Sequence, residues 1–414
     1  MNAARNFSNK TFAALRVRNF RLYFVGQLIS VSGTWMQSVA QGWLVLQLTG
    51  SSVGLGVAVA LQYVPILLFG FYGGLVADRH EKRQILYLTQ LSAGLLALIL
   101  AVMVSTHHVS AGAVYVLASL LGVVNLFDMP ARQAFVQQMV GRDLITNAVS
   151  LNSVLMNAGR LIGPGVAATF IAVMGMAACF YANALSYLAV LVALAMMSSQ
   201  DFLPMATVVR ERGQMRLGLK YVASAPMLRN SLVAVAAVGT FGFNFAVTLP
   251  LLARTTFHQR SAAQYGLMMA AMGLGAVIGG LFIAHRSRPT PKLMATLATG
   301  FGVFLVLVAF APSLVWAELM LVPTGAFGIA FISTCNATLQ LNSNQEMRGR
   351  VMSLYGTAFM GSTPIGAPLM GLIIGATSPR LGLMVGACTT LVIGAWLIMT
   401  HDKNVASTEA LRVA

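Results

Sequence analysis

Residues 53–83 read VGLGVAVALQYVPILLFGFYGGLVADRHEKR, a long apolar run that ends in a short loop of acids and bases. The run from 53 to 76 contains no charged residue. About 20 apolar residues suffice for a helix to cross a bilayer, because the hydrocarbon layer is about 30 Å thick and a helix rises about 1.5 Å per residue. Eleven further stretches of this kind fill almost all of the remaining chain. The sequence therefore predicts a protein whose solvent is lipid.

The composition excludes a water-soluble fold. Of 414 residues, 57% are hydrophobic and 9% are charged, whereas soluble domains carry about 25% charged residues. A soluble fold of this length could not hide so much apolar surface, because part of any surface faces water. The predicted fold class is an all-α membrane protein.

Twelve transmembrane helices are predicted, in two bundles of six. Their approximate ranges are 20–48, 53–76, 84–105, 111–128, 147–173, 178–198, 231–253, 264–284, 291–311, 315–336, 353–376 and 382–400. A polar stretch divides them, which predicts an N-terminal bundle in residues 1–198, a cytoplasmic basic linker in 199–230 and a C-terminal bundle in 231–414. Within the linker, Gly218 to Leu228 is expected to form a short amphipathic helix on the cytoplasmic surface.

The basic residues indicate orientation rather than nucleic-acid binding. A net charge of +16 would suit a nucleic-acid partner, but Lys and Arg lie in short connectors on one set of alternate loops. Arg254, Arg260 and Arg380 fall on the opposite loops and Arg160 falls inside a helix, which leaves 22 of the 26 basic residues on the side of the termini. By the positive-inside rule, both termini are predicted to be cytoplasmic.

The loop after the second predicted helix carries Gly74, Asp78, Arg79, Lys82 and Arg83. Gly74 allows close contact between helices, and Asp78 at a helix end can accept hydrogen bonds from the backbone N–H groups of a neighbouring helix N-terminus. The three basic residues can bind anionic lipid or a nearby carboxylate. The alternative interpretation is an ordinary positive-inside loop with one acid.

This loop resembles the signature between helices two and three of the major facilitator superfamily of transporters. The resemblance implies a twelve-helix fold that works by alternating access. It also implies that the five residues act as a cytoplasmic latch, which steadies the outward-facing state against helix eleven. Glu81 stands where the family usually has glycine, and the equivalent loop of the second half has Ala284 in place of the acid. The latch is therefore expected on one side only.

The segment Asp128-Met-Pro-Ala-Arg132 and the segment 348–353, Arg-Gly-Arg-Val-Met-Ser, resemble the bacterial exporter branch that includes enterobactin exporters. With the opening of the first helix, the resemblance covers nearly the entire chain. Asp128 is predicted at the cytoplasmic end of the fourth helix. We hypothesise that Asp128 and Arg132 join the latch by pairing with its basic and acidic members, Asp128 with Lys82 in particular.

The fifth predicted helix carries a stripe of small residues. Gly159, Gly163 and Ala167 are spaced at i, i+4 and i+8, which lets another helix approach closely, and Pro164 permits a bend. The pattern resembles the Gly-x-x-x-Gly-Pro motif of exporter-type members, although Ser150 replaces a further glycine of that motif. A generic tight helix pair is the alternative.

Arg160 lies near the middle of the same helix. A lone Arg at that depth costs about 2.5–3.5 kcal/mol on insertion scales, so it should face a water-filled cavity or a partner. Asn157 lies one turn away. The functional interpretation is a contact with substrate or with a gate, and the alternative is a structural charge bonded to backbone carbonyls.

Polar side chains on two helices predict a substrate cavity. One face of the first helix carries Gln27, Ser30, Thr34, Gln37 and Gln41, at spacings of 3 and 4. The seventh helix carries Thr240, Asn244 and Thr248. Because polar groups facing lipid are costly, these faces should line a cavity or another helix. Together with Asn157 and Arg160 they are the predicted cavity residues, and hydrogen bonding between helices is the alternative.

The sequence has neither a Walker-type nucleotide loop nor a cluster with metal-ligand spacing, so no cofactor and no metal are expected. Proton coupling needs a protonatable group on the path, and Asp128 and Glu318 are the candidates. The predicted function is export of a small, partly apolar molecule, drug-like or siderophore-like, by proton antiport across the bacterial cytoplasmic membrane. The expected partners are this substrate, protons and membrane lipids, with no nucleic acid and a monomeric state. A proton-coupled importer, a membrane-embedded enzyme and a transport-inactive sensor are the alternatives.

Overall fold

The chain is all-helical in the part that the computed structural model describes, residues 12–203, 214–286 and 289–400. The first half forms η1 (Ala13–Arg16), α2 (Arg18–Thr49), α3 (Ser52–Arg79), α4 (Lys82–Ser105), α5 (Ala111–Met174), α6 (Met176–Met196) and η2 (Ser199–Asp201). The second half forms α7 (Gln214–Ser224), α8 (Pro226–Phe241), α9 (Phe245–Leu251), η3 (Leu252–Thr256), α10 (Ala262–His285), α11 (Pro291–Ala309), α12 (Leu314–Leu341), α13 (Gln345–Met360), α14 (Ser362–Ala376) and α15 (Pro379–Met399).

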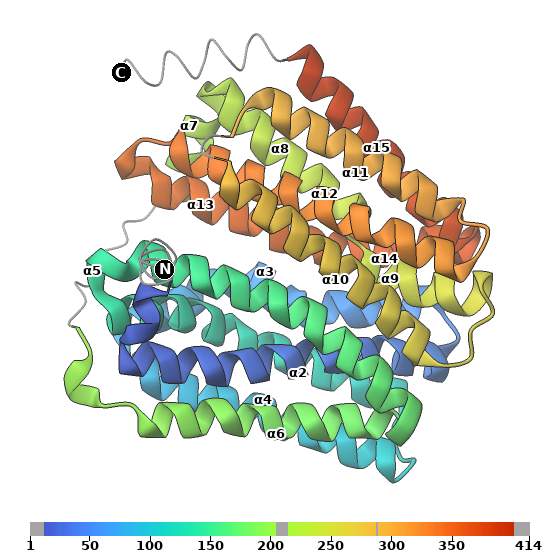
Figure 1. Ribbon diagram of the computed structural model, residues 1–414, viewed down its shortest axis with the longest axis horizontal. Helices are drawn as coiled ribbons and strands as arrows, with labels where there is room; N and C mark the ends of the chain where they lie inside the picture. Colours follow the sequence, from blue (N-terminus) through green and yellow to red (C-terminus); the bar gives the residue numbers. More distant parts are fainter. Residues whose placement is uncertain (1–11, 204–213, 287–288, 401–414) are drawn as a thin grey trace, which may run out of the picture.

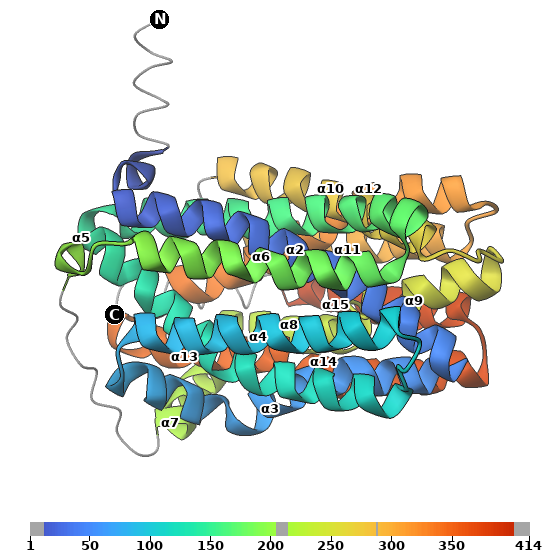
Figure 2. The same ribbon diagram turned by 90° about the horizontal axis from the view of Figure 1, so that it is seen from below.

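The long helices run side by side along the long axis of the molecule (Figure 1; Figure 2). In the first half α2 packs on α5 and α6, α3 packs on α5, and α4 packs on α6. In the second half α10 packs on α12, and α11 packs on α12 and α15. The two sets meet where α5 contacts α10 and where α3 contacts α14.

Eleven helical segments of the described chain are long and apolar enough to cross a membrane. They coincide with every predicted span except the first. That span is α2, which is 32 residues long but is not one of the eleven. Its glutamine, serine and threonine side chains lower its hydropathy, and they belong to the polar face that the sequence predicts.

The predicted loop between 128 and 147 is wrong, because α5 continues through most of it. The helix bends at Gly141, whose φ of 72° and ψ of −179° interrupt the helical backbone. Two spans result, Ala111–Gly141 and Asp143–Met174. Pro130 does not end the first of them, although it leaves the carbonyl of Leu126 without its helical N–H partner. Gly73 of α3 has no side chain where this carbonyl approaches, so the two backbones pack closely.

Two consequences follow for residues that the sequence assigns to a cytoplasmic loop or helix end. Asp128 lies in the middle of the first span of α5 and is buried, not at its cytoplasmic end. Arg132 lies one turn further along the same helix and therefore does not belong with the basic residues of the connecting loops.

The seventh predicted helix is also discontinuous. Instead of one helix over 231–253, α8 ends at Phe241 and α9 begins at Phe245. Asn244 Nδ2 donates to the carbonyl of Thr240 at 2.6 Å, and Thr248 Oγ1 donates to the carbonyl of Asn244 at 3.1 Å. Asn244 thus bonds through its side chain to the carbonyl one turn back, whereas the Thr248 hydroxyl adds to the hydrogen bond that the same carbonyl already accepts from the Thr248 N–H. The predicted helix 353–376 begins earlier, at Gln345, and is interrupted at Gly361 between α13 and α14.

The expected surface helix in the linker lies earlier than predicted. α7 spans Gln214–Ser224, and Pro226 begins α8, because proline suits the first turn of a helix. α7 packs against α13, where Gly218 faces Arg350. The linker residues 204–213 lie outside the described residues, as do the predicted cytoplasmic termini, 1–11 and 401–414.

The two sets of helices touch at the end of the molecule opposite η1 (Figure 1). Ser52 Oγ donates to the carbonyl of Gly371 at 2.7 Å in a buried contact between α3 and α14. Gly56 faces the carbonyl of Ala367 without a side chain between them. In the neighbouring pair, a Cβ on Gly266 of α10 would lie 2.9 Å from the carbonyl of Pro164. Backbone therefore packs on backbone near the loops 50–51 and 377–378.

Candidate functional site

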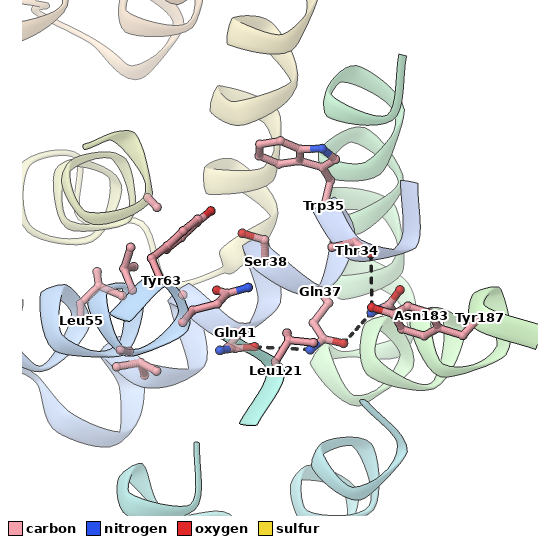
Figure 3. Close-up of a pocket in the computed structure, with 16 residues that line it drawn as sticks. Thr34, Trp35, Gln37, Ser38, Gln41, Leu55, Tyr63, Leu121, Asn183 and Tyr187 are labelled. Atoms are coloured by element: carbon pink, nitrogen blue, oxygen red, sulfur yellow. Dashed lines mark hydrogen bonds between the residues drawn. The ribbon is translucent and has the colours of Figure 1, made fainter. Parts of the chain in front are cut away.

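A cavity of about 130 Å³ opens among α2, α3, α5, α6 and α9 (Figure 3). Its lining is Thr34, Trp35, Gln37, Ser38, Gln41, Gly42, Val45, Leu55, Ala58, Val59, Gln62, Tyr63, Leu121, Asn183, Tyr187 and Ala246. Pockets for drug-sized ligands measure roughly 300–1,000 Å³. In this arrangement the cavity therefore holds only part of such a molecule.

One wall of the cavity is a chain of polar side chains from α2 and α6. Asn183 Nδ2 donates to Gln37 Oε1 at 2.7 Å, and Gln37 Nε2 donates to Gln41 Oε1 at 3.4 Å. The hydroxyls of Thr34 and Tyr187 lie 3.5 Å apart. The amides point toward one another from the two helices in Figure 3. An amide carries two donor hydrogens and an acceptor oxygen, so these groups can also bind a guest.

The predicted polar face of α2 divides into two parts. Thr34, Gln37 and Gln41 line the cavity. Gln27 and Ser30 are buried nearer the N-terminal end of α2 and do not line the cavity. Gln27 Oε1 accepts a hydrogen bond from Arg132, and the carbonyl of Ser30 accepts one from Thr34.

The predicted residues of the seventh helix do not line this cavity. Thr240 Oγ1 donates to the carbonyl of Ala236, and Asn244 and Thr248 bond to their own helix at the break. Ala246 is the lining residue from this segment.

Besides Ser38 on α2, four polar lining residues are missed by the sequence reasoning. They are Gln62 and Tyr63 on α3 and Asn183 and Tyr187 on α6. Each pair sits inside an otherwise apolar span, and Asn183 and Tyr187 are one helical turn apart. Polar residues at membrane depth point to functional positions, so this signal could have found them.

A second polar centre is built around Asp128 in the first half. Its carboxylate is buried and forms an ion pair with Arg132, one turn along α5. Thr89 Oγ1 and Gln90 Nε2 of α4 donate to Asp128 Oδ1 at 2.8 and 2.7 Å. Arg132 in turn donates to Gln27 Oε1 of α2 at 2.5 Å. Side chains from α2, α4 and α5 thus meet at one ion pair.

The predicted latch loop lies at the junction of α3 and α4, where Gly74 is buried and Arg79 is exposed. Arg83 reaches α6: its guanidinium donates to the carbonyl of Leu194 and to Ser199 Oγ, both at 2.6 Å. A cation at the carboxyl end of a helix satisfies free carbonyls and complements the helix dipole. Lys82 forms no ion pair with Asp128 among the described residues, because Asp128 pairs with Arg132.

The small residues of the predicted fifth helix, the second span of α5, lie between two neighbours. A Cβ on Gly159 would lie 2.5 Å from Val31 Cγ1, and one on Gly163 would lie 2.5 Å from the carbonyl oxygen of Ser32. α2 therefore approaches this span more closely than any side chain would permit. On the other side, the carbonyl of Pro164 faces Gly266 of α10.

Arg160 lies on this span with its guanidinium over the ring of Trp35, 5.0 Å from the ring centroid. This is a cation–π distance. Its Nε is buried and has no hydrogen-bond partner among the described residues. Asn157 does not provide one, since its Nδ2 donates to the carbonyl of Ser153 at 2.9 Å. Trp35 connects Arg160 to the cavity, because the same tryptophan is one of the lining residues.

The remaining candidate acid, Glu318, lies in the second turn of α12 and is half-buried. It is distant in sequence from the lining helices and does not line the cavity. In the described ranges no cluster of three His, Cys, Asp or Glu residues could hold a metal ion.

Apolar helices of membrane-spanning length, packed in two sets with a polar cavity lined mainly by the first set, are typical of a multi-pass membrane transporter. The family described as transmembrane secretion effector matches residues 9–413. The chain therefore belongs to this family of major facilitator transporters, and the resemblance seen in the sequence is confirmed. The family and its relatives are transporters, not enzymes.

Characterised relatives are similar over most of their length. The staphyloferrin A transporter of Staphylococcus aureus is 26% identical over 367 residues, which cover 85% of this chain and 88% of that protein. The multidrug efflux pump Tap of Mycolicibacterium fortuitum is 25% identical over 90% of this chain and 93% of its own length. The enterobactin exporter EntS of Escherichia coli is 26% identical over 92% and 91%.

Solved structures show the same fold at low sequence identity. A POT family transporter superposes with a TM-score of 0.72 at 12% identity, covering 94% of this chain and 96% of that one. A bacterial homologue of the lysosomal transporter Spinster, in an inward-facing conformation, superposes with a TM-score of 0.68 at 12% identity over 95% and 97%.

Proposed function

We propose that the chain is a secondary active exporter of a small, partly apolar molecule, drug-like or siderophore-like, in the bacterial cytoplasmic membrane. In this proposal α2 also spans the membrane, which raises the number of spans from eleven to twelve. Residues 1–198 and 231–414 are six-helix bundles joined by the linker 199–230. Both termini are cytoplasmic, and the protein works as a monomer surrounded by lipid. The bundles rock around a site near the membrane midplane, as in other transporters built from repeats.

The cavity beside α2 is the observation that carries the proposal. Its amides and hydroxyls lie inside the apolar belt, where polar groups are costly unless they serve a guest or a partner. The opposite wall is apolar and aromatic, with Leu55, Tyr63 and Leu121. A partly apolar molecule with hydrogen-bonding groups complements both walls. The contact between Ser52 and Gly371 closes the far end, which supports entry from the cytoplasmic side.

The direction of transport follows from the relatives. Two of the similar proteins are named as an efflux pump and as an exporter. Their similarity over most of both chains favours export over import here. It also supports a siderophore-like or drug-like substrate, without deciding between them.

Proton coupling is proposed at Asp128. Its carboxylate holds Arg132 on α5 and, through Arg132, Gln27 on α2. A proton on Asp128 would remove the charge that holds Arg132 and would free α2 to shift against α5. Glu318 is the second candidate, and its place near one end of α12 gives it weaker support.

The latch is proposed to act within this cycle. Gly74, Asp78, Arg79, Lys82 and Arg83 lie at the α3–α4 junction, which in this proposal is cytoplasmic. The hydrogen bonds from Arg83 to the end of α6 support a role in fixing helices of the first bundle to each other.

The test is accumulation of a panel of dyes, antibiotics and siderophores in inside-out vesicles, with the proton gradient intact and then collapsed. We expect gradient-dependent accumulation of at least one compound. Gln37→Ala should lower its rate by about tenfold, the effect of removing a hydrogen bond worth about 1.4 kcal/mol.

Thr296→Ala on α11 is the matched control, because within the described residues this exposed hydroxyl bonds only to the carbonyl of Lys292 in its own helix. It should leave accumulation unchanged. Accumulation in right-side-out vesicles instead would make the chain an importer, and flux of no compound in either orientation, with folded protein, would withdraw the transport proposal.

A further inference from the structure

Two arginines lie deep within the membrane helices of the described chain, and their electrostatic surroundings differ. Arg132 is paired with Asp128. Arg160 has no carboxylate within ion-pair distance among the described residues. It has the Trp35 ring on one side. Arg160 is thus a cation whose charge the described protein does not neutralise.

The depth of Arg160 excludes lipid headgroups as its partner. The second span of α5 runs from Asp143 to Met174. At about 1.5 Å per residue, Arg160 lies about 21–26 Å from either end. A charge there is expensive unless it meets an opposite charge or water, and the cation–π contact offsets only part of the cost. An anionic solute is therefore the partner that fits this position.

A basic pocket at the far end of the molecule gives independent support. It measures about 450 Å³ and is lined by Trp43, Gln47, Arg254, His258, Gln259 and Arg260, with no carboxylate in the lining. Outer loops are normally depleted of Lys and Arg. Yet two of the three basic residues on this chain's predicted outer loops, Arg254 and Arg260, line one pocket.

One role of Arg254 is structural, because its Nη1 donates to the carbonyl of Leu46 at the end of α2 at 2.5 Å. A guanidinium has five N–H groups, and among the described residues the others of Arg254 form no hydrogen bond. An anion that leaves the cavity toward the outer face would meet this pocket.

We propose that the transported molecule is an anion, and that Arg160 receives its negative group, a carboxylate or a group of like chemistry, beside Trp35 at the edge of the cavity. The amides of Gln37 and Asn183 then bind the uncharged polar part of the same molecule. This inference rests on the proposed transport function and narrows its substrate class.

The experiment uses the full chain in phosphatidylcholine nanodiscs and two probes of the same shape, 2-naphthoate and its uncharged analogue 2-naphthamide. Equilibrium dialysis measures the affinity of each probe, and quenching of tryptophan fluorescence reports its place. We expect naphthoate to bind at least about tenfold more tightly, as a charge-assisted hydrogen bond predicts. Trp35→Phe should remove most of the quenching if the probe binds beside this ring.

Substitutions at Arg160 separate charge from folding. Arg160→Gln should abolish the preference for naphthoate and leave naphthamide binding unchanged. Arg160→Lys should keep part of the preference, because the charge remains while the planar donor pair is lost. Retained naphthamide binding shows that the variants are folded. Equal affinities for the two probes, no saturable binding of naphthoate, or an unchanged naphthoate affinity in Arg160→Gln would each overturn the inference.

The outcome is distinguishable from failure of the transport proposal, because binding is measured without flux. If the preference for naphthoate depends on Arg160 but the protein transports nothing in vesicles, the anion site is supported and the transport proposal is wrong. If the protein exports neutral compounds alone and has no preference for naphthoate, the transport proposal is supported and the anionic substrate is wrong.

Discussion

Asp128 owes its surroundings to helices that are distant in the sequence. The carboxylate lies inside the protein and meets Arg132 of its own helix and Thr89 and Gln90 of α4. Buried charges are tolerated in apolar surroundings when they are paired and hydrogen-bonded. Asp128 meets both conditions.

Removal of this carboxylate should destabilise the protein. Asp128→Asn leaves Arg132, whose side chain is 24% exposed, without its counter-charge. Breaking one side of a fully buried pair costs about 3–5 kcal/mol, and the loss here should be smaller because water reaches the guanidinium. We expect a clear fall in the thermal unfolding midpoint in detergent. The double variant Asp128→Asn/Arg132→Met should recover part of that loss, because no unpaired charge remains.

Lys82→Gln serves as the control for this cycle. Lys82 and Asp128 form no ion pair in the described structure, so the two substitutions should be additive within about 0.5 kcal/mol. Strong coupling between Lys82 and Asp128 instead would favour the direct contact that the sequence suggested.

At the scale of elements, the second span of α5 is held between α2 and α10 by positions without side chains. Gly159 and Gly163 face α2, and Gly266 and Gly273 of α10 face α5. Backbone contact of this kind compensates for the missing hydrophobic drive between helices in lipid. This packing also sets the position of Arg160 along the helix axis relative to Trp35.

A methyl group at Gly163 should therefore disturb the α2–α5 contact. Its Cβ would lie 2.5 Å from both the carbonyl of Ser32 and Trp35 Cβ, so one helix must move. We expect Gly163→Ala to destabilise the protein by about 1–3 kcal/mol, as overpacking does. The measurement is the thermal unfolding midpoint in detergent.

Gly165 offers the matched comparison, two residues away on the same helix. A Cβ there would meet Ala270 Cβ at 4.0 Å, which is an ordinary contact. Gly165→Ala should leave the midpoint unchanged or raise it slightly, because alanine favours the helix. A similar fall for both substitutions would mean that helix propensity or lipid contact, not the approach of α2, decides the effect.

At the scale of the whole molecule, the two sets of helices meet in two places. The α3–α14 contact lies near the loops 50–51 and 377–378, and the α5–α10 contact extends from Gly266 at that end to Gly273, which faces the backbone of Arg160. An exporter that releases its substrate at this end must separate them. The contact between Ser52 and Gly371 would then break in every cycle.

A cross-link across this end should stop transport. A Cβ on Gly375 would lie 2.7 Å from Ser52 Oγ, which suits the geometry of a disulfide. We expect Ser52→Cys/Gly375→Cys, with the exposed Cys388 replaced by serine, to lose export in vesicles on oxidation and to regain it on reduction. Loss of thiol labelling measures the fraction of the two cysteines that have formed the disulfide.

Each single-cysteine variant should keep its export under the same oxidant. Full export by the cross-linked protein would mean that this end does not open during transport, and alternating access between these two sets of helices would be wrong.

Local features of the sequence were enough to identify a multi-pass transporter and its family. A stretch such as 53–76 crosses the bilayer because of its own hydropathy, and the loop at 74–83 carries its motif in consecutive residues. The polar face of α2 was visible because its spacing follows one helix. Breaks were harder to predict, since Pro130 leaves α5 intact while the Gly242–Asn244 region interrupts the seventh predicted span.

The sequence by itself determined that the protein lies in a lipid membrane, where nearly all of its spans fall and which family it belongs to, because hydropathy and motif spacing belong to single segments. The tertiary structure alone decided that Thr34, Gln37 and Gln41 share a cavity with Asn183 and Tyr187, whereas Gln27 serves Arg132. It also decided that Arg83 holds the end of α6 and that Arg160 stacks on Trp35. Partners of this kind depend on which helix faces come together, and that is fixed by packing among glycines and side chains from distant parts of the chain.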